Sequence, residues 1–85
     1  MQQAHSVQSV LLASNELNRL KANVDACRAA NTHNPMTNCQ RRTLTTISND
    51  VRALRGVAQS RSDAASAATT ARAVQVLNDI RAMMH

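Results

Sequence analysis

Two cysteines and one histidine are the residues whose types and spacing could do chemistry. Cys27 and Cys39 each lie six residues from His33, which gives a C-x5-H-x5-C pattern. We favour a structural disulfide, which would stabilise a small chain by about 3 kcal/mol in the chain-entropy model and would imply an oxidising compartment. Two buried free thiols that act as small core residues are one alternative. Metal ligation by all three residues is the other, although the spacing matches no common zinc pattern.

The other groups that could catalyse a reaction are scattered along the chain. His5 and His85 lie near its ends, and no acidic residue adjoins any of the three histidines. No G-x-S-x-G setting surrounds a serine, and a single glycine cannot build a phosphate-binding loop. We therefore expect no enzymatic activity, no cofactor, no metal and no small-molecule substrate.

Helices must position the two cysteines, because Ala, Leu, Arg, Gln and Asn are frequent and β-branched runs are nearly absent. The sequence predicts a first helix over about 2–31 and a turn at 31–35. Its apolar residues alternate spacings of three and four, an a/d seam over three heptads. The seam consists of Val10, Ala13, Leu17, Leu20, Val24 and Cys27, and Val7 and Leu11 widen it at its start.

Asn34 and Pro35 predict the start of a second helix over about 35–58, with Asn34 as its cap. We expect Cys39 on the first turns of this helix, facing Cys27 across the turn. Gly56 either ends this helix or weakens a longer one. The seam of the second helix repeats the a/d spacing with Leu44, Ile47, Val51, Leu54 and Ala58.

A third helix is predicted over about 62–84, after a break at 59–63. Ser60 or Ser62 would cap it, with Asp63 in its first turn. Its apolar stripe consists of Ala73, Leu77, Ile80 and Met84, with Val76 and Met83 beside it. One continuous helix from Pro35 to Met84 is the main alternative.

The composition limits the core that these helices can share. The chain has 85 residues and no aromatic residue, and 15 of its 37 apolar residues are Ala. We expect one all-α domain over 1–85, an antiparallel helical hairpin extended to a small three-helix bundle with coiled-coil-like seams. A core this thin lies near the limit of independent folding, which favours a disulfide, a protein partner or self-association.

The charge balance favours acidic partners. The chain has ten Lys and Arg residues and five Asp and Glu residues, which gives a net charge of +5. Four arginines stand in the second helix and are the candidate contacts to a polyanion: Arg41, Arg42, Arg52 and Arg55. A solvated surface is the simpler interpretation, because no aromatic residue is present on which bases could stack.

These features favour a small interaction or adaptor module that docks onto a protein partner or onto itself. Such a module could serve as an inhibitor, an exclusion protein or a component of an envelope or secretion assembly. The polar composition and the cysteine pair suit a periplasmic or secreted protein of a bacterium or phage; free cysteines would place it in the cytoplasm. No apolar run is long enough to span a bilayer, and no signal peptide is visible. A basic nucleic-acid-binding regulator is the alternative.

In two places the chain resembles the needle subunits of type III secretion systems, which are helical hairpins with a proline in the turn. The places are Asn34-Pro35 and the stretch over 73–80. The chain differs from that family in four ways. The distance between the two places is longer here, the first proline of the turn is missing, aromatic residues are absent, and two cysteines are present that the family pattern lacks. The resemblance implies a secreted filament subunit as a further alternative.

Overall fold

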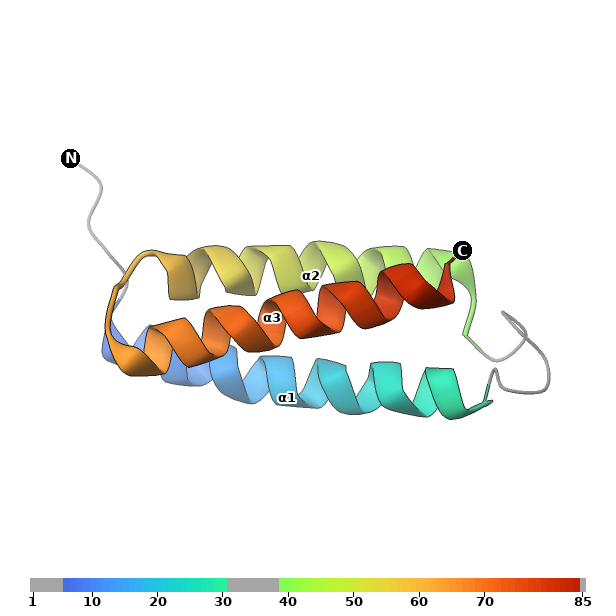
Figure 1. The fold of residues 1–85 in the computed structure, drawn as a ribbon, viewed down its shortest axis with the longest axis horizontal. Coiled ribbons are helices and arrows are strands. Elements are labelled where there is room, and N and C mark those ends of the chain that lie inside the picture. Colours follow the sequence, from blue (N-terminus) through green and yellow to red (C-terminus); the bar gives the residue numbers. More distant parts are fainter. Residues whose placement is uncertain (1–5, 31–38, 85) are drawn as a thin grey trace.

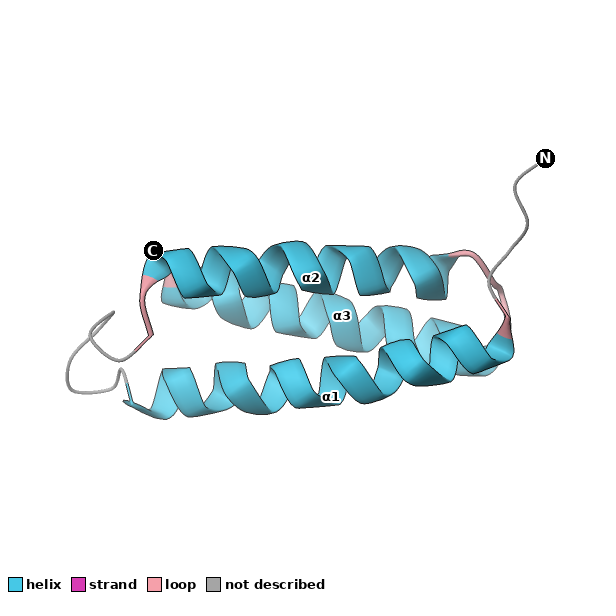
Figure 2. Cartoon of the chain, turned by 180° about the vertical axis from the view of Figure 1, so that it is seen from behind, coloured by secondary structure: helices cyan, strands magenta, loops and turns pink. Residues whose placement is uncertain are grey.

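The structure, a computed structural model, describes residues 6–30 and 39–84. These residues form three helices, α1 (Val7–Ala30), α2 (Arg41–Gln59) and α3 (Ala64–Met83), and contain no strand. Each helix packs against the other two (Figure 1). α3 lies in front of α1 and α2 in Figure 1 and behind them in Figure 2, so it covers one side of that antiparallel pair. The expected all-α three-helix bundle is confirmed.

The bundle has one half with large core residues and one half with small ones. The large residues come mainly from the second half of α1, the first half of α2 and the end of α3. Together with Cys39 and Ala73 they form one cluster: Leu17, Leu20, Val24, Cys39, Leu44, Ile47, Val51, Ala73, Val76 and Ile80. Towards the α2–α3 turn the buried side chains become shorter. They include Ala13, Ala58, Ser66 and Thr69, and Val10 is the large buried side chain among them. The larger apolar area, and with it most of the hydrophobic stabilisation, therefore lies in the half that carries the cysteines.

Buried hydroxyl groups are tolerated in the small half because each has a local acceptor. Thr69 Oγ1 donates to the carbonyl of Ala65 at 2.9 Å. Ser66 Oγ donates to Asp63 Oδ1, also at 2.9 Å. A hydroxyl that is hydrogen-bonded within its own helix can be buried at little free-energy cost, and these short side chains let α3 lie close to its neighbours.

The seam predicted for α1 is confirmed, except at its start. All its members are buried or packed against the core cluster. Val7 and Leu11 were expected to widen it, and this was wrong, since 47% and 48% of their surfaces are exposed. Leu11 instead lines an open pocket between α1 and α3, beside the small residues Ala65 and Ala68.

The stripe predicted for α3 was wrong by one residue in its middle. Val76 and Ile80 are fully buried, whereas Leu77 and Met84 are only partly buried at the edge of the core. The buried stripe continues towards the N-terminus of α3 through Ala73, Thr69 and Ser66. In α2, Leu44, Ile47, Val51 and Ala58 are buried as expected, while Leu54 packs against the cluster from its edge.

Several predicted boundaries needed correction. α2 begins at Arg41, because Gln40 before it is extended, with φ −69° and ψ 154°. α3 is capped by Asp63 rather than by a serine. α2 ends at Gln59, so the alternative of one continuous helix from Pro35 to Met84 was wrong. The three helices also differ from the helical hairpin that the resemblance to needle subunits implies. The turn at 31–35, with His33 and Asn34, lies outside the described residues, as do the helix ends predicted at 2–5 and 35–38.

Candidate functional site

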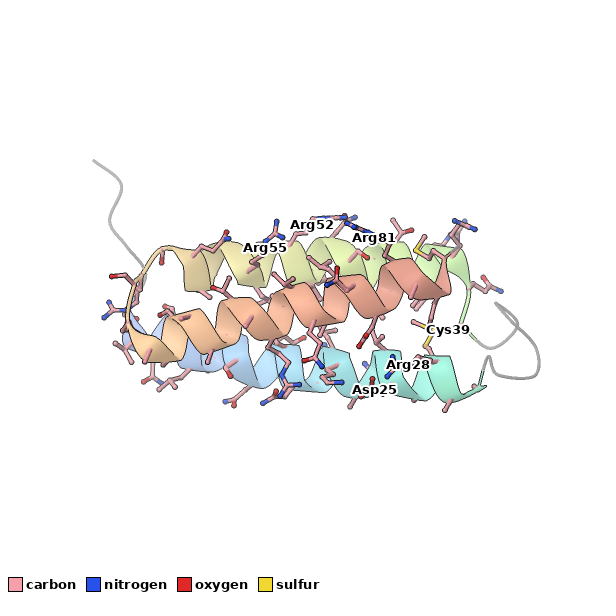
Figure 3. The ribbon with its side chains drawn as sticks, viewed as in Figure 1. Asp25, Arg28, Cys39, Arg52, Arg55 and Arg81 are labelled. Atoms are coloured by element: carbon pink, nitrogen blue, oxygen red, sulfur yellow. A yellow bond between two sulfur atoms is a disulfide. The ribbon has the colours of Figure 1, made fainter. Side chains whose placement is uncertain are left out.

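The two cysteines meet at one end of the bundle. Their sulfur atoms lie at disulfide-bonding distance, and their Cα atoms are 5.3 Å apart. Cys27 lies in the last turn of α1, and Cys39 is buried just before α2 (Figure 3). Cys39 was expected inside the helix. Because helix axes pack about 8–10 Å apart, the position of Cys39 before the extended Gln40, outside the helix, lets it approach α1 more closely than a helical residue would.

A groove of about 400 Å³ lies between α2 and α3. Leu77, Ile80 and Met84 of α3 supply its apolar lining, and the buried Ser48 of α2 adds one hydroxyl. Three arginines line it as well: Arg52 and Arg55 from α2 and Arg81 from α3. Figure 3 shows these three side chains gathered along the α2–α3 side of the molecule. The groove therefore combines an apolar surface with positive charge from both helices.

The groove arginines make few contacts within the chain. Over residues 6–30 and 39–84 none of the three takes part in an ion pair. Arg52 Nη1 lies 3.4 Å from Asn49 Oδ1, a long hydrogen bond. Arg55 Nε is buried and has no hydrogen-bond partner. A buried donor without a partner is destabilising.

Arg41 marks the end of the groove near the cysteines. Its Nη2 donates to the carbonyl of Met84 at 3.3 Å, which joins the start of α2 to the end of α3. The spacing of Arg41, Arg52 and Arg55 predicts a common face of α2, and Arg52 and Arg55 do line one groove. Arg42 is exposed and does not line it.

Four of the five acidic residues form ion pairs away from the groove, and Asp50 of α2 forms none within the described residues. Asp25 lies 2.9 Å from Lys21 Nζ and 3.2 Å from Arg28 Nη2, and the hydrogen bond from Lys21 lowers the pKa of its carboxyl below the usual value. Arg28 also lies 3.4 Å from Asp79, which ties α1 to α3. Glu16 pairs with Arg19 on α1. The charges of α1 and of its boundary with α3 are thus largely balanced, while those of the α2–α3 groove are not.

Most of the residues predicted as a core or partner-binding seam belong to the core. Eight of them are buried: Val10, Leu17, Leu20, Val24, Leu44, Ile47, Val51 and Ile80. Leu77 and Met84 are partly buried and reach the groove, where Ile80 also contributes to the lining. The sequence analysis did not single out Arg81 or Ser48. The spacing of Leu77, Arg81 and Met84, four and three residues apart, was the signal that places Arg81 on the apolar edge of α3.

Comparison of the chain with models of protein families, with curated proteins and with solved structures finds no match. Within the part of the chain that the structure describes, none of the helices combines the length and apolar character that crossing a membrane requires.

Proposed function

We propose that this protein is a small, non-enzymatic helical interaction module that docks its α2–α3 groove onto a protein partner. The observation that carries the proposal is the coincidence of an apolar surface with arginines that lack ion pairs. Apolar surface supplies binding free energy, and arginine is enriched in the centres of protein interfaces. An adaptor, an inhibitor or a component of an envelope or secretion assembly would each use such a surface.

One exposed apolar residue adjoins the lining of the groove. Val74 lies one turn before Leu77 on the same edge of α3, and 41% of its surface is exposed. Val7, Leu11 and Leu12 also expose apolar surface at the start of α1. Leu11 lines a second pocket, between α1 and α3, together with Arg72. The groove is the stronger candidate because three arginines without ion pairs in the described residues line it, whereas one lines the pocket at Leu11.

A different protein fits the groove better than a second copy does. A two-fold symmetric dimer formed through this groove would bring the same patch of both copies together. Arg52, Arg55 and Arg81 of one copy would then face those of the other, and like charges repel. The charge of the groove therefore favours an acidic partner.

We propose an oxidising compartment outside the cytoplasm, periplasmic or extracellular, as the place where the protein works. The close approach of Cys27 and Cys39 supports this, because structural disulfides persist mainly in oxidising compartments.

A site-specific photo-crosslinker tests the docking surface. It is placed at Val74 and, as a control, at Leu12, which is 60% exposed on α1. We expect the Val74 position to capture a partner from the native cells that the Leu12 position does not. The captured protein is then purified, and its Kd is measured against the unmodified module. Val74→Glu should weaken binding at least tenfold and Leu12→Glu less than twofold; equal Kd values for both variants contradict the proposal.

Nucleic acid is the second candidate, favoured by the absence of ion pairs at Arg41, Arg42, Arg52, Arg55 and Arg81 within the described ranges. Binding driven by phosphate contacts falls steeply as salt rises. Titration of duplex and single-stranded DNA and RNA at 50 and 200 mM salt tests this candidate. The absence of binding at the lower salt concentration excludes it.

A further inference from the structure

We propose that the α2–α3 groove receives an acidic amphipathic helix, whose apolar face covers Leu77 and Met84 while its carboxylates bind the arginines of the groove. This inference rests on the proposed docking function and names the chemistry of the partner. A groove between two packed helices is a common receptor for a third helix, which inserts apolar side chains spaced three and four residues apart.

The apolar part of the groove has the periodicity that such a helix needs. Leu77, Ile80 and Met84 lie three and four residues apart along α3. Ile80 is 1% exposed and belongs to the core, whereas Leu77 and Met84 are partly buried and present apolar atoms about two helical turns apart, roughly 11 Å. Methionine adapts its shape to different neighbours, so Met84 suits the open end of a docking surface. A helix laid along α3 would meet Leu77 and Met84, which are partly buried.

The arginines stand on both helices that form the groove. Arg52 and Arg55 come from α2 and Arg81 from α3. A guanidinium binds a carboxylate through two parallel hydrogen bonds, which gives orientation as well as affinity. Acidic residues that flank an apolar stripe on both sides of the partner helix would therefore meet arginines on both sides.

Arg55 is the groove arginine with an unpaired buried donor. Its Nε is buried and lacks a hydrogen-bond partner, whereas most buried donors in folded proteins have one. Because this atom is covered in the free chain, the Arg55 side chain must turn for its N–H to donate to a carboxylate oxygen, which would also neutralise the charge of the guanidinium. An apolar or basic partner surface would supply neither the acceptor nor the negative charge.

The lining distinguishes an acidic helix from a nucleic-acid backbone. Sugar and phosphate groups gain little from contact with Leu77 and Met84, and the chain has no aromatic residue on which a base could stack. An acidic amphipathic helix uses the apolar surface and the arginines together, and it fits the charge complementarity expected at protein interfaces.

Defined peptides provide the test. The first peptide has about 20 residues, with an apolar stripe flanked by Glu. The second has the same composition in an order that destroys the stripe, and the third replaces each Glu by Lys. Binding to the full chain is measured by fluorescence anisotropy at 150 mM salt. We expect the first peptide to bind at least tenfold more tightly than the other two. Equal affinity of the first two would overturn the inference, because general charge attraction would then suffice.

Variants locate the binding site. Arg55→Gln should weaken the first peptide about tenfold, and the combined change of Arg52, Arg55 and Arg81 to Gln should weaken it further. Arg42→Gln and Arg19→Gln remove the same charge outside the groove and should change the Kd less than twofold. Circular dichroism verifies that each variant is folded. Equal effects of Arg55→Gln and Arg42→Gln would contradict the assignment.

A charge-reversal variant separates a loss of binding from a loss of folding. The double variant Arg52→Glu with Arg81→Glu should bind the Lys-flanked peptide in preference to the Glu-flanked one, a gain that a damaged fold cannot produce. Failure of the preference to reverse overturns the inference. Tighter binding of duplex DNA than of the acidic peptide, abolished by the same variants, overturns it in favour of a phosphate backbone.

The outcomes also separate this inference from the docking function on which it rests. A partner that is captured at Val74 and bound by the groove, but that has no acidic helix, refutes the acidic helix and leaves the docking function standing. No capture at Val74 and no peptide binding refute both.

Discussion

Asp63 Oδ1 accepts two hydrogen bonds from Ser66, one from the backbone N–H and one from the hydroxyl, both at 2.9 Å. One oxygen atom thus caps α3 and also satisfies the hydroxyl of a fully buried serine. The other carboxylate oxygen accepts from Arg61 Nε at 2.7 Å. The carboxylate of Asp63 therefore holds the α2–α3 turn and the start of α3 in one arrangement.

The first prediction concerns the pH dependence of stability. The hydrogen bond from Arg61, followed by those from the N–H and hydroxyl of Ser66, lowers the pKa of Asp63 from 3.8 to about 2. A carboxyl with a lowered pKa stabilises the folded state above its unfolded pKa, and this stabilisation is lost as the pH falls towards the folded value. We expect Asp63→Asn to lower the urea midpoint at pH 7 and to flatten its decline between pH 4 and pH 2.

The matched control for Asp63 is Asp50→Asn, which removes an exposed carboxylate of α2 that takes part in no ion pair within the described ranges. It should leave the decline between pH 4 and pH 2 parallel to that of the unmodified protein. If the Asp63→Asn curve is parallel too, the hydrogen bonds at Asp63 do not stabilise the fold.

The second prediction concerns the cysteine pair, whose members are 12 residues apart in the chain. Closing a loop of this size stabilises a protein by about 3 kcal/mol in the chain-entropy model. We expect a reducing agent to lower the free energy of unfolding by that amount, and the joint change of Cys27 and Cys39 to Ala to abolish the effect of the reducing agent. Thiol titration of unfolded, unreduced protein should find no free thiol; two per chain would rule out the bond.

The third prediction compares two leucines of α1. Leu17 is 0% exposed in the centre of the core, whereas Leu12 is 60% exposed. Leu17→Ala leaves a cavity and should cost about 2–5 kcal/mol of stability. Leu12→Ala should change it by less than about 0.5 kcal/mol, as is usual for a surface substitution. Urea denaturation followed by circular dichroism measures both, and similar losses would show that α1 is rotated about its axis.

The fourth prediction concerns Gly56, which lies inside α2. A Cβ atom added there would meet no atom within 4 Å. Alanine has a higher helix propensity than glycine and lowers the entropy of the unfolded chain. We expect Gly56→Ala to stabilise the protein by about 0.5–1 kcal/mol, read as a higher urea midpoint with an unchanged slope. A lower midpoint would mean that α2 is interrupted at this position.

Large apolar residues with regular spacing made the fold predictable. In α1 the members of the seam are mostly leucine and valine, so the buried face follows from the period of the helix. In α3 this signal fails, because Ser66 and Thr69 carry hydroxyls whose burial depends on acceptors that form only once the turn is built. Val76 and Leu77 are adjacent in the sequence, and both are apolar. Which of the two enters the core is decided by the rotation of α3 against α1 and α2.

The candidate site was predictable only on one of its two sides. The spacing of Arg52 and Arg55 is a property of α2 alone, and the periodicity of a helix is enough to place them together. The contribution of Arg81 depends on the register between α2 and α3, and that register is set by packing between residues distant in the chain. The missing hydrogen-bond partner of Arg55 Nε is likewise a property of the packed bundle.

The position of the cysteine pair has a consequence for the covalent continuity of the molecule. Cys27 and Cys39 stand on either side of the connection between α1 and α2. Once their bond is formed, hydrolysis of a peptide bond between them yields two polypeptides that remain one molecule. A nicked protein would keep its mass, apart from one added water, and would separate into an N-terminal and a C-terminal piece only on a reducing gel.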